Sequence, residues 1–125
     1  HGQADAVWLL LESGASVGAT TGDGSTALFV ACYEGQVECA HLLLEASAAI
    51  SQAANDGATP LFVACYKGRL ECVRLLLEAS AAVNQARENG ATPLYIACEK
   101  GQLECARLLL EASAAINQAR DSGAT

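Results

Sequence analysis

The sequence predicts an all-α repeat array in which each unit contains two short helices and a turn. The main observation is a seven-residue segment that returns every 33 residues and begins at Thr26, Thr59 and Thr92. Its second copy reads Thr-Pro-Leu-Phe-Val-Ala-Cys. A fixed period of this length is typical of a supersecondary unit that buries its apolar face against neighbouring copies. Residues 1–125 are therefore predicted to form a single domain with one continuous core.

The three segments divide the chain into complete units at residues 21–53, 54–86 and 87–119. Residues 1–20 match the second half of a unit, and residues 120–125 match the beginning of another. Both ends of the chain are thus expected to be partial repeats.

The first helix of a unit is expected to begin directly after the threonine. Thr59 is a suitable N-cap because its hydroxyl can accept a hydrogen bond from a free backbone N–H, and Pro60 suits the first helical position because it has no N–H. The helix is predicted to end near Gly68, and its counterparts near Gly35 and Gly101, because glycine readily adopts the left-handed conformation found at helix ends.

The second helix is expected over about residues 70–79, where apolar residues follow a helical spacing at Leu70, Val73, Leu76 and Leu77. A turn segment is predicted after it in each unit. The pairs that favour a tight, hairpin-like turn are Asp23-Gly24, Asp56-Gly57 and Asn89-Gly90.

Composition and charge exclude several classes of partner. The chain is 52% apolar and carries a formal charge of -7, which disfavours nucleic acid and anionic membranes. No apolar run approaches the roughly 20 residues that a membrane-spanning helix needs. A basic or mixed protein surface would associate faster with this chain than an acidic one.

The six cysteines follow the period, with two in each complete unit, at positions 32, 39, 65, 72, 98 and 105. This regularity favours reduced thiols in the core over a disulfide framework. Neither His1 nor His41 recurs with them, so no metal site is expected. Reduced thiols indicate a cytoplasmic or nuclear location. No nucleophile and base, paired carboxylates or glycine-rich phosphate loop is apparent, so neither catalysis nor a cofactor is expected.

The second unit carries a recognisable pattern: Gly-x-Thr-Pro-Leu-x-x-Ala, then a glycine, Leu-Glu, Leu-Leu-Leu, an alanine and Val-Asn. This pattern resembles the ankyrin repeat, and the resemblance covers the whole chain. It implies antiparallel helix pairs stacked into a curved solenoid, with β-turn or hairpin loops projecting to one side. It also implies a protein-binding module without chemistry of its own. Where the family usually has histidine, this chain has Phe29, Phe62 and Tyr95, so more apolar packing is expected there.

In ankyrin repeats a partner commonly binds along the concave groove and the turn tips, where the units of this chain also differ most. On the first helices this surface would consist of Tyr33, Tyr66 and Glu99, with Glu34, Lys67 and Lys100 beside them. Its rim would consist of the turn residues Asp23, Asp56, Arg87, Glu88 and Asn89. Tyrosine is common at interfaces, although Tyr33 and Tyr66 could instead only cover neighbouring helices.

Asn84 and Asn117 stand where ankyrin repeats commonly carry asparagine. That residue usually has a structural role through turn hydrogen bonds. In this family it can also be a substrate for hydroxylation, and both interpretations are open here.

Two alternatives to a binding module are a structural spacer within a longer array and an engineered repeat protein. The partial units at the ends also predict end-to-end self-association. A helix over residues 4–11 would lack a preceding helix, and residues 108–110 would belong to a unit without a successor, which exposes apolar surface at both ends.

Overall fold

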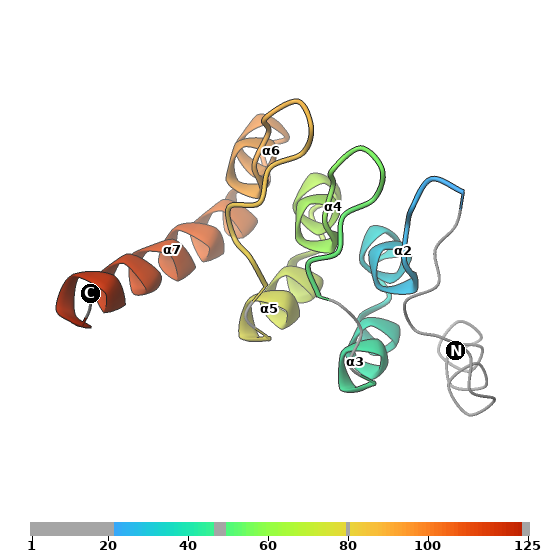
Figure 1. Cartoon of the computed structure of the whole chain (residues 1–125), viewed down its shortest axis with the longest axis horizontal. Coiled ribbons are helices and arrows are strands. Elements are labelled where there is room, and N and C mark those ends of the chain that lie inside the picture. The colour runs from blue at the N-terminus through green and yellow to red at the C-terminus, as the bar shows by residue number, and fades with distance from the viewer. Residues whose placement is uncertain (1–21, 47–49, 80, 124–125) are drawn as a thin grey trace.

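The computed structural model describes residues 22–46, 50–79 and 81–123, and the structural statements below concern these residues (Figure 1). They form six helices and no strand, which confirms the predicted all-α class. The helices are α2 (Ala27–Glu34), α3 (Val37–Glu45), α4 (Pro60–Lys67), α5 (Leu70–Glu78), α6 (Pro93–Glu99) and α7 (Leu103–Gly123). The partial repeat predicted for residues 1–20, with its helix over residues 4–11, lies outside the described residues.

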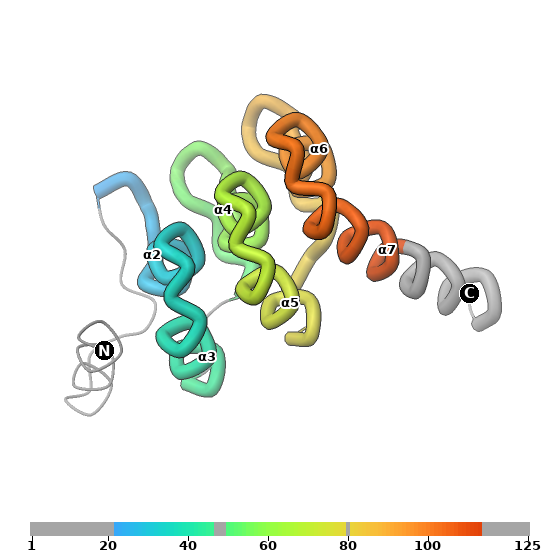
Figure 2. The backbone as a smooth tube through the Cα atoms, turned by 180° about the vertical axis from the view of Figure 1, so that it is seen from behind, coloured from blue at the N-terminus to red at the C-terminus, as the bar shows by residue number. Residues whose placement is uncertain are grey.

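The helices form two layers of a stacked array. Helices α2, α4 and α6 lie side by side in one layer, and α3, α5 and α7 lie behind them in the other (Figures 1 and 2). Each first helix also contacts the second helix of its own repeat. Between the pairs, the chain forms turns that project beyond the first layer (Figure 1). The α4–α5 pair is therefore packed between the α2–α3 and α6–α7 pairs.

The first helices begin and end as the sequence predicts. The hydroxyls of Thr26 and Thr59 accept hydrogen bonds from backbone N–H groups three residues later at 3.1 Å, and that of Thr92 does so at 3.2 Å. Gly35 and Gly68 end α2 and α4 with φ angles of 75° and 71°. Capping at both ends satisfies backbone groups that such short helices leave unpaired.

A carboxylate or amide closes each of the three projecting turns, and backbone hydrogen bonds also close the second and third. In the second repeat Ala54 N–H donates to the Ala58 carbonyl at 2.8 Å, and Gly57 has a φ of 87°. The Asp56 side chain accepts from Ala58 N–H at 3.0 Å. These bonds confirm the turn predicted at Asp56-Gly57 and explain why a short acceptor and a glycine are needed there.

Consecutive turns are also bonded to each other. Asn55 N–H donates to the Asp23 carbonyl, and Glu88 N–H donates to the Asp56 carbonyl, each at 2.9 Å. These two bonds occupy equivalent places in adjacent repeats. They fix the turns relative to one another as well as to their helices.

The core runs between the two layers and contains most of the cysteines. Its largest fully buried side chains include Leu28, Leu61, Leu76 and Leu109. All six cysteines are free and five are buried, but Cys98 is exposed, so the prediction of a core thiol is wrong at that position. The equivalent Cys65 is covered by the following repeat, whereas no helix pair covers the outer side of α6 within the described residues.

The last helix also differs from the prediction. A turn is expected after about residue 112, in the unit at 87–119, and a new unit is expected at 120–125, but α7 continues as helix to Gly123. In the preceding repeat Ala81 and Val83 are buried where the chain leaves the helix. Among the described residues no helix pair follows the α6–α7 pair. The alanine-rich segment therefore follows its own helix propensity.

Candidate protein-binding groove

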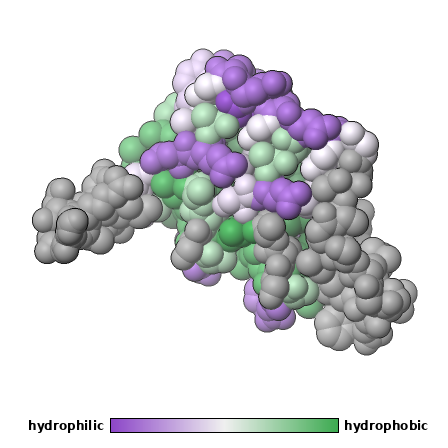
Figure 3. Space-filling view, viewed as in Figure 1, coloured by the Kyte–Doolittle hydropathy of each residue, from purple (hydrophilic) through white to green (hydrophobic). Residues whose placement is uncertain are grey.

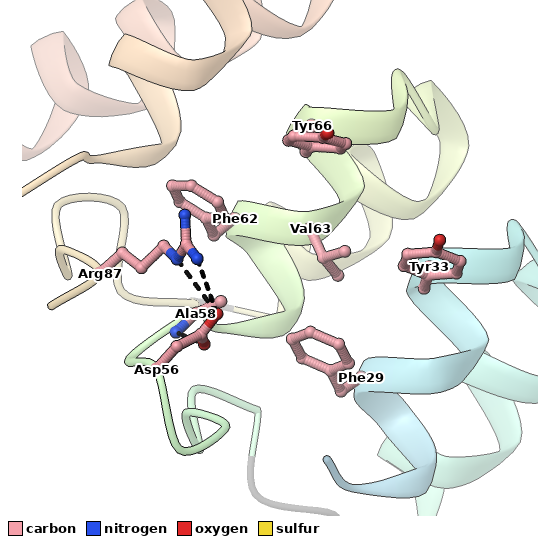
Figure 4. A pocket seen from close by; sticks show the side chains of 8 residues that line it. All are labelled: Phe29, Tyr33, Asp56, Ala58, Phe62, Val63, Tyr66 and Arg87. Carbon is pink, nitrogen blue, oxygen red and sulfur yellow. Dashed lines mark hydrogen bonds and ion pairs between the residues drawn. The ribbon is translucent and has the colours of Figure 1, made fainter. Parts of the chain in front are cut away.

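A groove of about 310 Å³ lies between the first helices of two adjacent repeats (Figure 4). We call it the α2–α4 groove. It is lined by Phe29, Tyr33, Asp56, Ala58, Phe62, Val63, Tyr66 and Arg87. Hydrophilic residues gather over the projecting turns that border this part of the surface (Figure 3).

The floor of the groove is apolar. Phe62 and Val63 are buried, and Phe29 packs against the same core while partly exposed. Phe29 and Tyr33 are four residues apart on α2, so both point to the same side of the helix, and Phe62 and Tyr66 repeat this relation on α4 (Figure 4). Sequence reasoning missed Phe29, Phe62 and Val63 as groove residues, although the four-residue spacing from the tyrosines could have identified Phe29 and Phe62.

Tyr33 and Tyr66 flank the groove, with 43% and 42% of their surface exposed. The Lys67 ammonium lies 5.0 Å from the centroid of the Tyr33 ring, and the Lys100 ammonium lies 4.9 Å from that of Tyr66. Each tyrosine is thus approached by a lysine of the next repeat and keeps much of its surface accessible. The structure brings four of the predicted surface residues together here.

Glu34 and Glu99 are exposed at the ends of α2 and α6 and do not line the groove. Glu34 occupies on α2 the position that Lys67 occupies on α4, and Glu99 corresponds to Tyr66. Glu34 is the chain neighbour of Tyr33, and Glu99 is the chain neighbour of Lys100.

Asp56 and Arg87 bind each other at the turn side of the groove. The Arg87 Nη2 atom lies 3.1 Å from Asp56 Oδ2, and Nε donates to the same oxygen at 3.1 Å (Figure 4). The Arg87 guanidinium also lies 5.9 Å from the centroid of the Phe62 ring. This pair joins two repeats, a role that the sequence did not indicate.

The other predicted rim residues hold the turns. The side-chain oxygens of Asp23 and Asn89 accept hydrogen bonds from the backbone N–H groups of Ser25 and Ala91, at 3.2 Å and 3.0 Å. Glu88 is exposed, and its backbone N–H belongs to the bond between turns. At least Asp23, Asp56 and Asn89 therefore have structural roles at the rim.

Asn84 is exposed on the turn after α5, whereas Asn117 lies within α7. The two asparagines therefore have different backbone environments. Hydroxylation of either residue stays a prediction.

Burial and one hydrogen bond shift the pKa values of several buried thiols. Burial raises the pKa of Cys65 and Cys105. A hydrogen bond to Cys72, followed by burial, raises the pKa of Cys32, and the same bond lowers the pKa of Cys72. In the part of the chain that the structure describes, no three His, Cys, Asp or Glu side chains gather as metal ligands, and no helix is long and apolar enough to span a membrane.

Comparison with protein families agrees with this architecture. The family model described as ankyrin repeats (3 copies) matches residues 1–87 and 48–121. No match was found among the curated proteins. Because the two overlapping matches span nearly the whole chain and the helix pairs stack as repeats, the chain belongs to the ankyrin repeat family.

Proposed function

We propose that this chain binds a protein or peptide partner through the α2–α4 groove. Ankyrin repeats are generally protein–protein interaction modules. The observation that carries the proposal is the apolar floor of the groove between two half-exposed tyrosines, Tyr33 and Tyr66. Aromatic side chains around a desolvated centre are typical of the residues that dominate binding energy.

The dimensions of the groove suit one large side chain of a partner. Ligand sites are concave and mostly apolar, with a few placed polar groups. Here the polar groups are the two tyrosine hydroxyls and the Asp56–Arg87 ion pair (Figure 4). The ion pair and the bonds between turns hold this side of the groove in place before a partner arrives, which reduces the entropy cost of binding.

The test compares capture of partners by three forms of the chain. The Tyr33→Ala/Tyr66→Ala variant should fold but lose the proteins that the unchanged chain captures from a cell lysate, as identified by mass spectrometry. Tyr95→Ala is the matched control, because Tyr95 is 58% exposed and does not line the groove. Unchanged capture by the double variant would contradict the proposal, and loss of its helical circular dichroism would assign both tyrosines to the fold. A spacer without a partner would give no specific capture by any form.

We also propose self-association through the outer face of α6 and α7. Tyr95, Leu103 and Leu110 are 58%, 73% and 54% exposed there, and Cys98 is exposed beside them. The equivalent Phe62, Leu70 and Leu77 pack against the core, with the following repeat beside them. Exposed apolar surface of this kind favours association with another repeat.

Analytical ultracentrifugation over a range of concentrations tests this second proposal. Leu103→Glu/Leu110→Glu should remove any concentration-dependent dimer. Gln85→Glu adds a negative charge on an exposed turn and should leave the dimer in place. A chain that remains monomeric at millimolar concentration would refute self-association.

The free and mostly buried thiols support a reducing location, the cytoplasm or the nucleus.

A further inference from the structure

The two lysines of this chain both lie beside the α2–α4 groove. They are Lys67 and Lys100. The Lys67 ammonium lies over the Tyr33 ring, 5.0 Å from its centroid, and the Lys100 ammonium lies over the Tyr66 ring, 4.9 Å from its centroid. They occupy the same position in consecutive repeats. Both are exposed, so the ammonium groups remain accessible to solvent and to a partner.

The described arginines are bonded to other groups of the chain, whereas the two lysines form no ion pair with a described carboxylate. Arg74, Arg87 and Arg107 each form an ion pair with a carboxylate, and Arg69 Nε donates to the Tyr33 carbonyl at 3.1 Å. Within the described residues no carboxylate lies within ion-pair distance of Lys67 or Lys100. The two lysines are therefore positive charges that the fold positions but does not neutralise.

A lysine held over an aromatic ring is partly ordered before binding. The contact with the ring is weak at an exposed site, and it leaves the charge intact. An incoming carboxylate then meets an ammonium that has already lost part of its rotamer freedom, so less entropy is lost on binding. Negatively charged groups of a partner are the complementary ligands.

The spacing of the two lysines suits an extended peptide. Helices that stack side by side lie roughly 8–10 Å apart, so equivalent residues of α4 and α6 have about this separation. A polyproline-type chain has three residues per turn and advances about 3.1 Å per residue, so two side chains three residues apart point to the same side and are separated by roughly 9 Å. Val63 and Phe29 lie in the space between α2 and α4, on the side where Tyr33 and Tyr66 flank the groove, and can receive a side chain that lies between the two carboxylates (Figure 4).

We propose that the α2–α4 groove binds an extended peptide segment in which a large apolar side chain lies between two carboxylates three residues apart. The inference rests on the groove function proposed above and specifies its ligand. The apolar side chain packs on Phe29 and Val63 between the tyrosines, and the carboxylates pair with Lys67 and Lys100.

Nearby carboxylates limit how acidic this segment can be. Glu34 takes the place of a third lysine on α2, and Glu99 stands beside Lys100 at the other end. The formal charge of -7 also repels a highly acidic partner at a distance, although screening reduces this repulsion beyond about 8 Å at physiological ionic strength. The groove therefore selects a pair of carboxylates over a long acidic run.

Fluorescence anisotropy with labelled synthetic peptides tests the inference. The main probe has a leucine between glutamates at positions i and i+3, in a glycine, serine and proline background. Its matched controls carry glutamine or lysine in place of both glutamates, or alanine in place of leucine. At low salt the glutamate peptide should bind about tenfold more tightly than the glutamine peptide, and added salt should reduce the difference.

Two charge-reversal variants, which change the net charge equally, test whether Lys67 and Lys100 cause the preference for the glutamate peptide. Lys67→Glu/Lys100→Glu should abolish the preference for glutamate and favour the lysine peptide. Arg74→Glu/Arg107→Glu makes the same change in charge on the exposed side of the second helices and should retain the preference for glutamate. Acetylation of the two lysines should also abolish the preference, without a change of sequence.

The peptide results distinguish a failure of the acidic-ligand proposal from a failure of the proposed groove function. If the glutamine and glutamate peptides bind equally and Tyr33→Ala/Tyr66→Ala abolishes both interactions, the groove function stands and the acidic ligand is refuted. Equal loss in both charge-reversal variants would also refute it, because net charge alone would then explain the preference. If no peptide binds, the inference is overturned, and the lysate experiment with the tyrosine variants decides the groove function independently.

Discussion

Asp56 and Arg87 connect two consecutive repeats, and the same aspartate closes the turn of its own repeat. Asp56 Oδ2 pairs with Arg87 at 3.1 Å, while Oδ1 accepts a hydrogen bond from Ala58 N–H at 3.0 Å. The two carboxylate oxygens thus have different structural roles, one within a repeat and one between repeats.

Removing the carboxylate should therefore cost more stability than removing the guanidinium. We expect Asp56→Ala to lower the free energy of unfolding by about 1–2 kcal/mol, because a turn hydrogen bond is lost together with the ion pair. Arg87→Met should cost less than about 1 kcal/mol, since the pair is more than one-third exposed. Urea unfolding followed by circular dichroism measures both. Because both variants lose the ion pair, a larger cost for Arg87→Met would show that the contact of Arg87 with the Phe62 ring outweighs the turn hydrogen bond.

Gly57 and Gly90 provide a matched test of the contact between turns. Both have left-handed φ angles, 87° and 88°. A Cβ on Gly90 would meet nothing within 4 Å, whereas a Cβ on Gly57 would lie 2.7 Å from the backbone nitrogen of Glu88. Gly90→Ala should cost about 1–2 kcal/mol from the backbone conformation alone, and Gly57→Ala should cost at least about 1 kcal/mol more. Equal melting temperatures for the two variants would contradict the observed packing of the turns.

Cys98 should be the most reactive of the described thiols. It is exposed, while the other five are buried, and modification of a thiol requires access as well as the thiolate form. Brief treatment of the native protein with a maleimide should label Cys98, as located by peptide mass spectrometry. Cys98→Ser should remove this fast label and leave the slower ones unchanged. Fast labelling of Cys65 would show that the α4–α6 contact opens readily.

Alkaline pH should destabilise the fold through the buried thiols. Burial raises the pKa of Cys65 and Cys105 above the ordinary value of 9.0, so above about pH 9 the unfolded chain loses thiol protons that the folded chain retains. Unfolding then becomes more favourable as the pH rises. Each such thiol contributes up to about 1.4 kcal/mol per pH unit until the folded form also titrates.

Urea unfolding between about pH 8 and pH 10 measures this slope. Cys65→Ala should be less stable at every pH because of the cavity it creates, but its stability should fall less steeply with pH. The same slope in this variant as in the unchanged chain would exclude Cys65 as a source of the effect.

The sequence predicts best those features that depend on residues close together in the chain. The threonine caps, the glycine ends of α2 and α4 and the turn at Asp56-Gly57 all follow from local conformational preferences, and the structure contains each of them. The period then predicts stacking, because each short helix pair must bury its apolar side against another.

Features that depend on neighbours in space were predicted less well. Cys98 has the same sequence context as Cys65 but is not covered, and residues beyond 112 form helix instead of a turn. A repeat sequence carries the same local information in each copy, whereas packing depends on the presence of the next copy. The Asp56–Arg87 pair could not be predicted because the two side chains belong to different repeats.

For the groove, the sequence indicated the tyrosine position through its variation between otherwise similar units, and it indicated the lysines as the residues beside that position. It did not indicate that Phe29 and Val63 form the floor, because apolar residues at helical spacing usually belong to the core. Their accessibility depends on the gap between α2 and α4, which only the stacking geometry defines.

The packing of α4–α5 between two other helix pairs has a consequence for local unfolding. In a repeat array, opening is easiest where a pair has one covered side and hardest where both sides are covered. Amide hydrogens of α4 should thus exchange more slowly than those of α6. Since Phe62, Val63 and Tyr66 are all on α4, a partner meets its anchoring residues on the segment of the described array that opens least often.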